Sequence, residues 1–455
     1  MDVRSRIVAI SVLVATVAGP AAADEPNESS GPPGESEQIA LNRDGAAAAR
    51  WSSTSGALGA GLFGSEMGAT LDLGIDFGGA DYTMGFGARM RWLADSGFRR
   101  QDWDERSEWA GLLRYLTYSR STATTRAALA LGQLGGARLG NGAVIGGYSS
   151  ALDVDHRRLG AELRIEGQRY GGEGVIDDLV APRIAGLRGF VAGDRPIGRW
   201  QLGASLSGDL AAPTAANGSP APVPMPGPIP DVDPTGDQTR EVVPIAALDG
   251  AYRVRGQDGR VSGALHGDLV AVATLAVGAH LGLSAAAELA GAQVAASGEF
   301  RLGSDRYIAN WFGPLYERDR RSLAGMSSQL EVARAGGLAG LGSAFELAIS
   351  HPRIGEAQLS YAHQPGLGEL LSARIVAPYW RAVQGALWTA GRRSSTGADT
   401  ATWAMAAELR APLRHRLYIS AELARLYHRP GDAQGMTALW LATIAIGAAW
   451  QPDPP

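Results

Sequence analysis

Residues 69–92 read ATLDLGIDFGGADYTMGFGARMRW, two runs in which apolar and polar side chains alternate on either side of a glycine-containing turn. The apolar positions are Ala69, Leu71, Leu73, Ile75 and Phe77 in the first run, and Tyr82, Met84, Phe86, Ala88, Met90 and Trp92 in the second. Successive side chains of a strand point to opposite faces, so this period of two predicts two neighbouring strands, each with one apolar face.

The same period continues along the chain as far as its last apolar run, Trp440–Trp450, which has a tryptophan at each end of the apolar face. Ten residues that rise about 3.3 Å each and tilt by about 40° cover about 25 Å, the height of the apolar band of a membrane barrel. The opposite faces are rich in glycine, serine and alanine, as suits a barrel interior, whereas a soluble sandwich carries a wet polar exterior. A soluble secreted all-β protein stays an alternative.

These segments predict an all-β protein, a transmembrane antiparallel β-barrel of about 16 to 20 strands. Candidate strands begin near residues 56, 68, 82, 108, 125, 157, 182, 198, 242, 260, 277, 291, 325, 340, 355, 370, 381, 401, 415 and 437. The alanine-rich stretch Leu269–Ala295 could also form a helix, because alanine is the best helix former. Residues 170–181 are interpreted as a glycine-rich link in which Asp177 and Asp178 form a turn.

The ends of the chain define its organisation. Arg4 and Arg6 precede an apolar run and a small-residue site at Ala23, so residues 1–23 are expected to be a cleaved signal peptide. Residues 24–55 are expected to form a flexible periplasmic lead-in, residues 56–450 the barrel, and residues 451–455 a short tail. Within the barrel, the proline-rich residues 211–236 interrupt the strand pattern and predict a long loop, either exposed or folded into the mouth.

The signal peptide, alternating strands, aromatic strand ends and absence of cysteine resemble the outer-membrane β-barrels of Gram-negative bacteria. The resemblance implies an outer-membrane location, a porin-like architecture and the lipid bilayer as partner. One departure is that residues 451–455 follow Trp450, where such barrels usually end on an aromatic residue. Envelope partner proteins and a homo-oligomer stay open. The net charge of −5 gives no basic field for nucleic acid, and we expect no cofactor.

Two sets of side chains are candidate functional residues. The polar faces of the predicted strands would line the pore with both signs of charge, which predicts weak ion selectivity, or would form ion pairs that brace the interior. These residues are Asp72, Asp76, Arg89, Arg91, Glu162, Arg164, Glu166 and Arg199. The aromatic strand ends would form the membrane girdles, with Trp92, Trp200, Trp440 and Trp450 as members.

Three functions fit this sequence. The first is a channel for small solutes, and the second is a structural or export component of an envelope-spanning machine. The third, a barrel enzyme, would need a histidine beside a second group, such as His156 near Asp153 and Asp155, and we expect no enzyme. No two histidines have a metal-ligand spacing, so no metal site is predicted. The charged aromatic stretches Leu93–Ser107 and Ser304–Arg321 are surface loops at an interface girdle, or they constrict the lumen or dock a partner.

Overall fold

The computed structural model describes residues 51–450, apart from residues 105, 154–156, 196–197, 215–239, 257–259, 322–327, 353, 381–382, 394–401, 415 and 429–436. The predicted signal peptide, the lead-in up to residue 50, most of the proline-rich loop and the tail therefore lie outside the described residues. The first strand begins at Trp51, so the last five residues of the predicted lead-in belong to the barrel wall.

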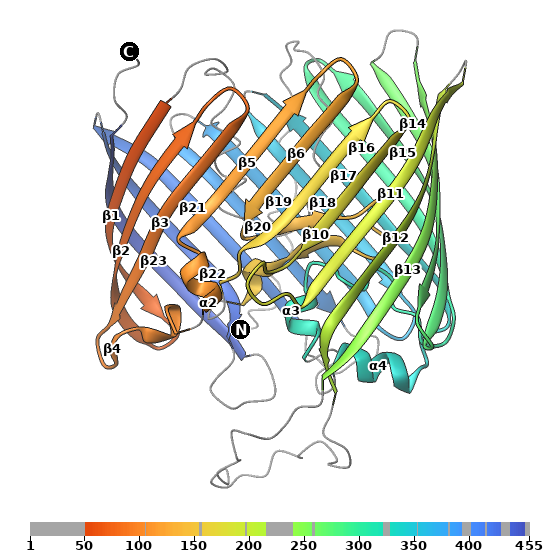
Figure 1. Ribbon diagram of the computed structural model, residues 1–455. Helices are drawn as coiled ribbons and strands as arrows, with labels where there is room; N and C mark the ends of the chain where they lie inside the picture. Colours follow the sequence, from red (N-terminus) through yellow and green to blue (C-terminus); the bar gives the residue numbers. More distant parts are fainter. Residues whose placement is uncertain are drawn as a thin grey trace, which may run out of the picture.

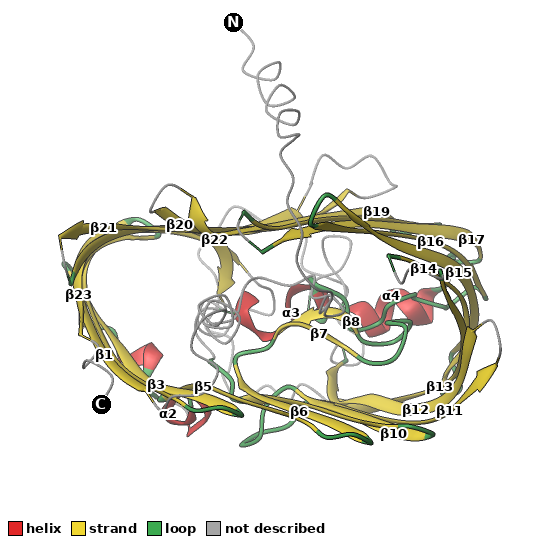
Figure 2. Cartoon of the chain, turned by 90° about the horizontal axis from the view of Figure 1, so that it is seen from above, coloured by secondary structure: helices red, strands yellow, loops and turns green. Residues whose placement is uncertain are grey.

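Twenty antiparallel strands form a closed barrel (Figures 1 and 2). Each strand pairs with the wall strand that follows it along the chain, and β1 pairs with β23 to close the ring. The wall strands are β1 (Trp51–Phe63), β2 (Glu66–Gly78), β3 (Tyr82–Leu93), β5 (Leu113–Ser121), β6 (Thr125–Gly132), β9 (Gly160–Gly167), β10 (Tyr170–Ile176), β11 (Ile184–Arg195), β12 (Gly198–Pro213), β13 (Arg240–Arg255), β14 (Val261–Val272), β15 (Ala276–Leu289), β16 (Ala292–Gly303), β17 (Gly340–His351), β18 (Gly355–Gln364), β19 (Gly368–Trp380), β20 (Val383–Arg393), β21 (Thr402–Arg414), β22 (Leu417–His428) and β23 (Thr437–Trp450).

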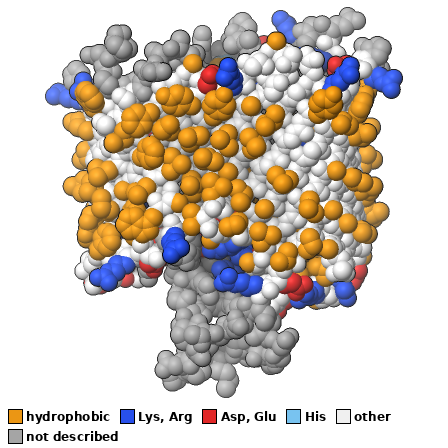
Figure 3. Space-filling view, viewed as in Figure 1, with side chains coloured by type: hydrophobic (Ala, Val, Ile, Leu, Met, Phe, Trp, Pro, Cys, Tyr) orange, Lys and Arg blue, Asp and Glu red, His pale blue; other side chains and the backbone are white. Residues whose placement is uncertain are grey.

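The outer surface of the wall is apolar. Leu206 and Leu283, near the middles of their strands, are each 64% exposed, and Ile444 is 62% exposed. Figure 3 shows hydrophobic side chains over the outer wall, with charged side chains gathered at the two rims. A large exposed apolar band is unfavourable in water but favourable in lipid, and closure of the ring pairs the edge strands that lipid could not solvate. The chain is an outer-membrane β-barrel.

The connections differ sharply between the two ends of the barrel. At the end where β1 begins and β23 ends, every connection is two to five residues long, for example residues 168–169 and 290–291. At the other end, four connections are much longer, namely residues 94–112, 133–159, 214–239 and 304–339. Outer-membrane barrels have short periplasmic turns and long extracellular loops. The short-turn end is therefore assigned to the periplasm, and the long-loop end, at the bottom of Figure 1, to the exterior.

Three expectations about single elements are corrected or resolved. Tyr170–Ile176 is the wall strand β10, so the interpretation of this stretch as a link between strands was wrong. The strand expected to begin near residue 325 lies partly outside the described residues, and its described part forms helix α4 (Gln329–Ala335) instead. The alanine-rich stretch forms β14, β15 and β16 instead of a helix. Among the described residues, no helix is long and apolar enough to span a membrane.

Candidate functional site

Two of the long connections fold into the barrel interior. The first luminal segment (residues 133–159) contains the short strands β7 (Gly135–Arg138) and β8 (Gly146–Ser149). The second luminal segment (residues 304–339) contains the helices α3 (Tyr316–Asp319) and α4. Figure 2, which looks down the barrel, shows β7, β8 and α3 inside the ring of wall strands. Of the alternatives for Ser304–Arg321, the structure matches the fold into the lumen and not the surface loop at an interface girdle.

The two luminal segments pack against each other with strand-like contacts. The backbone N–H of Phe312 donates to the carbonyl of Val144 at 2.9 Å, and that of Asn310 donates to the carbonyl of Ala143 at 3.0 Å. The side chains of Phe312 and Ile145 are fully buried. They belong to an apolar core that also contains inward-facing residues of β11, β13 and β14, such as Ile184 and Ile245. This core anchors both segments to the wall strands β11, β13 and β14.

A buried ionic network fastens the second luminal segment. Glu317 accepts a hydrogen bond from the Tyr148 hydroxyl at 2.6 Å and pairs with Arg158 at 2.6 Å. Arg158 also lies 3.3 Å from Asp177, whose other oxygen accepts two backbone N–H groups of the following turn. All four of these side chains are at most 3% exposed. A buried charge is tolerated only when it is paired, so the pairs bind both luminal segments to the loop at residues 177–183.

A second buried pair joins α3 to the wall. Asp209 of β12 accepts two hydrogen bonds from Arg320, at 2.7 and 3.0 Å, and one from the hydroxyl of Tyr316. Asp319 pairs with Arg392 of β20 at 2.9 Å. The helix is therefore tied to opposite sides of the barrel, which fixes it across the lumen.

Glu317 is the group whose ionisation supports this network. Desolvation by burial opposes its charged form, but the attraction and hydrogen bond of Arg158 outweigh burial and lower the pKa of Glu317 from 4.5 to about 2. The pKa of Tyr148 is raised, chiefly by burial, so its hydroxyl stays a donor. Burial also raises the pKa of Asp177, which accordingly takes up a proton more readily than an ordinary aspartate.

Acid should release the luminal segments. Because the pKa of Glu317 is lowered on docking, its contribution is fully present above pH 4.5 and is lost as the pH falls towards about 2. Asp177 acts in the opposite direction to Glu317. Because its pKa is raised when the luminal segments are docked, protonation of Asp177 favours the docked segments. For a barrel whose lumen conducts, we expect the bilayer conductance to be constant down to about pH 4.5 and to rise below it. In Glu317→Gln this rise should be absent, and an identical rise in that variant would contradict the assignment.

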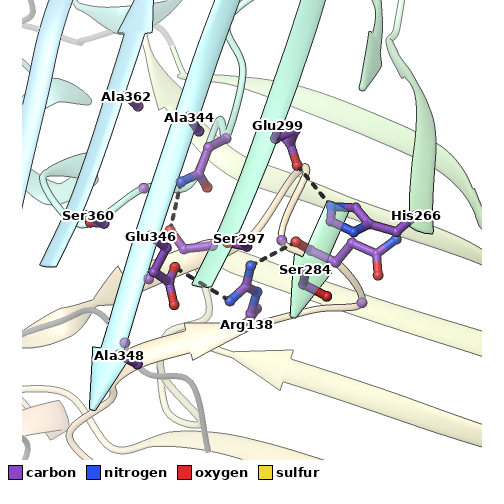
Figure 4. Close-up of a pocket in the computed structure, with 18 of the residues that line it drawn as sticks. Arg138, His266, Ser284, Ser297, Glu299, Ala344, Glu346, Ala348, Ser360 and Ala362 are labelled. Carbon is purple, nitrogen blue, oxygen red and sulfur yellow. Dashed lines mark hydrogen bonds and ion pairs between the residues drawn. The ribbon is translucent and has the colours of Figure 1, made fainter. Parts of the chain in front are cut away.

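The luminal segments and the wall enclose a cavity of about 930 Å³. Its basic lining residues are Arg138, Arg164, Arg195, Arg199, Arg253, Arg255, Arg301 and Arg392, and its acidic ones are Glu162, Glu166, Glu173, Asp194, Glu299, Asp319 and Glu346. Several form loose pairs, including Arg138 with Glu346 at 3.9 Å and Arg164 with Glu173 at 3.5 Å. Figure 4 shows Arg138 and Glu346 directed toward one another from the first luminal segment and from β17.

The residues predicted to line the pore divide into two groups. Glu162, Arg164, Glu166 and Arg199 line the cavity. Asp72, Asp76, Arg89 and Arg91 do not line it and instead form contacts with one another or with nearby polar groups. Arg89 lies 2.6 Å from Asp72 and 3.2 Å from Glu422, and the hydroxyl of Tyr115 donates to Asp76 at 2.8 Å. Arg91 is buried against Asp102 of the 94–112 connection. These contacts match the alternative in which interior charges brace the barrel.

Sequence reasoning missed six of the cavity arginines, namely Arg138, Arg195, Arg253, Arg255, Arg301 and Arg392. The alternation of Leu248, Tyr252 and Val254 with Arg253 and Arg255 was the signal that could have found two of them. The other charged aromatic stretch, Leu93–Ser107, stays against β3, where the N–H of Arg99 donates to the carbonyl of Arg91. His156, named for the enzyme interpretation, lies outside the described residues.

The four predicted girdle tryptophans lie near strand ends. Trp92 and Trp440 lie toward the long-loop end, and Trp200 and Trp450 toward the short-turn end. Trp92, Trp440 and Trp450 are 40%, 44% and 45% exposed, whereas Trp200 is half-buried. Arg416 lies over the ring of Trp450, 5.7 Å from its centre. Their membership of a lipid girdle stays a prediction.

No family model matches the chain, and no curated protein matches it. Solved structures that resemble it include the outer membrane protein opdK from Pseudomonas aeruginosa, 8% identical, with a TM-score of 0.32 over 88% of this chain and 99% of that one. Another is OccK2 (OpdF) of the same organism in complex with glucuronate, 8% identical, with a TM-score of 0.35 over 89% and 97%. The siderophore receptor PirA from Acinetobacter baumannii is 7% identical, with a TM-score of 0.36 over 89% and 81%. These likenesses assign no role to any residue of this chain.

Proposed function

We propose that the barrel is a porin-like channel for small polar solutes, with a weak preference for anions. The observation that carries this proposal is the charge-lined cavity of about 930 Å³ inside a closed barrel. Pockets of about 300–1,000 Å³ hold ligands of drug size, so the cavity fits solutes of that size or smaller. The two luminal segments would act as the constriction that sets the size limit.

The preference for anions follows from the pairing of the lining charges. Most lining carboxylates have a nearby arginine, as Glu166 has Arg199 at 3.7 Å. Arg253 and Arg255 are exposed, line the cavity near the short turns and form no ion pair with a described residue. Arg199 and Arg253 are also directly opposite each other on β12 and β13. Like charges in such positions repel, and a passing anion relieves the repulsion.

Reversing one of these charges should change the selectivity. In a salt gradient, we expect the reversal potential of Arg253→Glu to move from weakly anion-selective toward cation-selective, because the substitution replaces a luminal positive charge by a negative one. Arg120→Glu is the matched control, since Arg120 is exposed on β5 at the same end of the barrel but does not line the cavity. Equal shifts in both variants would contradict a luminal role for Arg253.

Swelling of liposomes that contain the purified barrel tests the function itself. We expect small sugars and amino acids to enter and larger oligosaccharides to be excluded, with anionic solutes favoured over cationic ones of equal size. A barrel that migrates as folded before heating but admits no solute would overturn the proposal. That result would favour a structural or export component, although the described turns at the periplasmic end offer little surface for such a partner.

A further inference from the structure

Three side chains from adjacent strands meet on the inner wall beside the luminal segments. Asp268 of β14 is directly opposite His280 of β15, and Glu299 of β16 is opposite Gly282, two residues further along β15. One potential ligand atom from each of the three side chains lies within 4.8 Å of the others. Nδ1 of His280 is 3.1 Å from Oε1 of Glu299. Nε2 of His266 lies 3.5 Å from the other oxygen of Glu299, and Figure 4 shows these two side chains directed toward one another.

Two atoms of this cluster lack a hydrogen bond although they are buried. Asp268 and His280 are each 4% exposed, yet Oδ2 of Asp268 has no hydrogen-bond partner among the described residues, and Nδ1 of His280 faces Oε1 of Glu299 at 3.1 Å without the geometry of a hydrogen bond. Leaving a buried polar atom without a partner costs free energy, so native proteins do so rarely. The two atoms are also lone-pair donors of the kinds that bind transition metals.

The remaining atoms of these side chains are held by other groups, as the ligands of a metal usually are. The hydroxyl of Tyr307 lies 2.8 Å from Nε2 of His280, which leaves Nδ1 to face the carboxylates. The side-chain amide of Asn141 donates to Oδ1 of Asp268 at 3.1 Å, which leaves Oδ2 open. Oε1 of Glu299, which faces Nδ1 of His280, also accepts a hydrogen bond from Arg301, and the other oxygen faces Nε2 of His266.

We propose that Asp268, His280 and Glu299 form a binding site for a divalent transition-metal ion of the Zn²⁺ class. The ligand atoms are Oδ2 of Asp268, Nδ1 of His280 and the carboxylate of Glu299. A separation of 3.1 Å between two donors fits ligands that each lie about 2.0–2.2 Å from a shared ion. His266 and Glu299 line the luminal cavity, which gives the ion a route in.

The site would join three parts of the molecule. Asn141 belongs to the first luminal segment and Tyr307 to the second, and each contacts a proposed ligand on the wall. A bound ion would therefore orient the side chains on which both segments rest. This inference does not depend on whether the barrel conducts, because binding is measured on the folded protein without reference to transport.

Calorimetric titration of Zn²⁺ into the metal-stripped, detergent-folded full chain tests the site. We expect one ion per chain, with affinity reduced by about 10–100-fold or more in Asp268→Asn and His280→Gln, and by about 10–100-fold in Tyr307→Phe. Glu346→Gln is the control, since Glu346 is another carboxylate lining the same cavity, and it should bind as the unmodified chain does. Heat-modifiable migration shows whether each variant is folded.

Two results would overturn the proposal. One is that the unmodified chain takes up no Zn²⁺ at millimolar concentration, and the other is that folded Asp268→Asn and His280→Gln bind as tightly as the unmodified chain. If both variants fail to fold, Co²⁺ titration of the unmodified chain decides whether the metal site exists. A visible spectrum of nitrogen and oxygen coordination that saturates at one equivalent supports the site, and its absence refutes it.

Discussion

Replacement of Glu317 by alanine should raise the single-channel conductance several-fold. Among the described residues, the substitution leaves Arg158 buried with Asp177, at 3.3 Å, as its one remaining charged partner, and it removes the acceptor of the Tyr148 hydroxyl. Removing one partner of a buried ion pair costs about 3–5 kcal/mol, because the other charge stays buried without compensation. We therefore expect the second luminal segment to leave the lumen for a larger fraction of the time.

Arg334→Ala is the matched control on the same luminal segment. Arg334 pairs with Glu241, but the two side chains are 42% and 45% exposed, and such surface pairs contribute about 0–1 kcal/mol. Its conductance should equal that of the unmodified barrel. If Glu317→Ala conducts as Arg334→Ala does, the buried network does not hold the constriction.

Replacement of Leu283 by arginine should strongly destabilise the folded barrel in the membrane. Leu283 is 64% exposed near the middle of β15, on the face assigned to lipid. An arginine on the lipid face at the bilayer midplane costs about 2–4 kcal/mol. The expected result is a lower midpoint of urea unfolding in liposomes, measured by the loss of heat-modifiable migration.

Ser284→Arg provides the control, one residue further along the same strand. Ser284 lines the luminal cavity, as Figure 4 shows, so the same added charge meets water and carboxylates instead of lipid. We expect little change in the unfolding midpoint. A larger loss of stability in Ser284→Arg than in Leu283→Arg would reverse the assignment of the two faces.

The barrel could be predicted from the sequence because strand alternation is a local signal. The run from Trp440 to Trp450 and the two runs in residues 69–92 are wall strands, and the predicted range of strand number includes the observed twenty. Strand β10 was missed because its outer face carries Gly172 and Gly174 between Tyr170 and Ile176, which leaves too few apolar side chains to show the alternation. Helix α4 did have a signal, the capping box of Ser328 and Glu331, which was overlooked.

The arrangement of charges in the lumen could be predicted only in part. Alternation placed Glu162 and Arg164 on the inner face, but partners such as Glu173 for Arg164 depend on the register of neighbouring strands. The ligands of the proposed metal site are likewise brought together by the register of neighbouring strands. Asp268 and His280 are twelve residues apart in sequence and become neighbours only through the pairing of β14 with β15, so no local spacing motif marks them.

Single-channel recording of the unmodified barrel in a planar bilayer at neutral pH tests the central claim most directly. The account predicts small, steady steps of current, because ions in the proposed channel would pass through the charged cavity that the luminal segments narrow. The same preparation must migrate as folded before heating. A folded barrel that stays silent, both unmodified and as Glu317→Ala, would contradict the claim that its lumen is a channel.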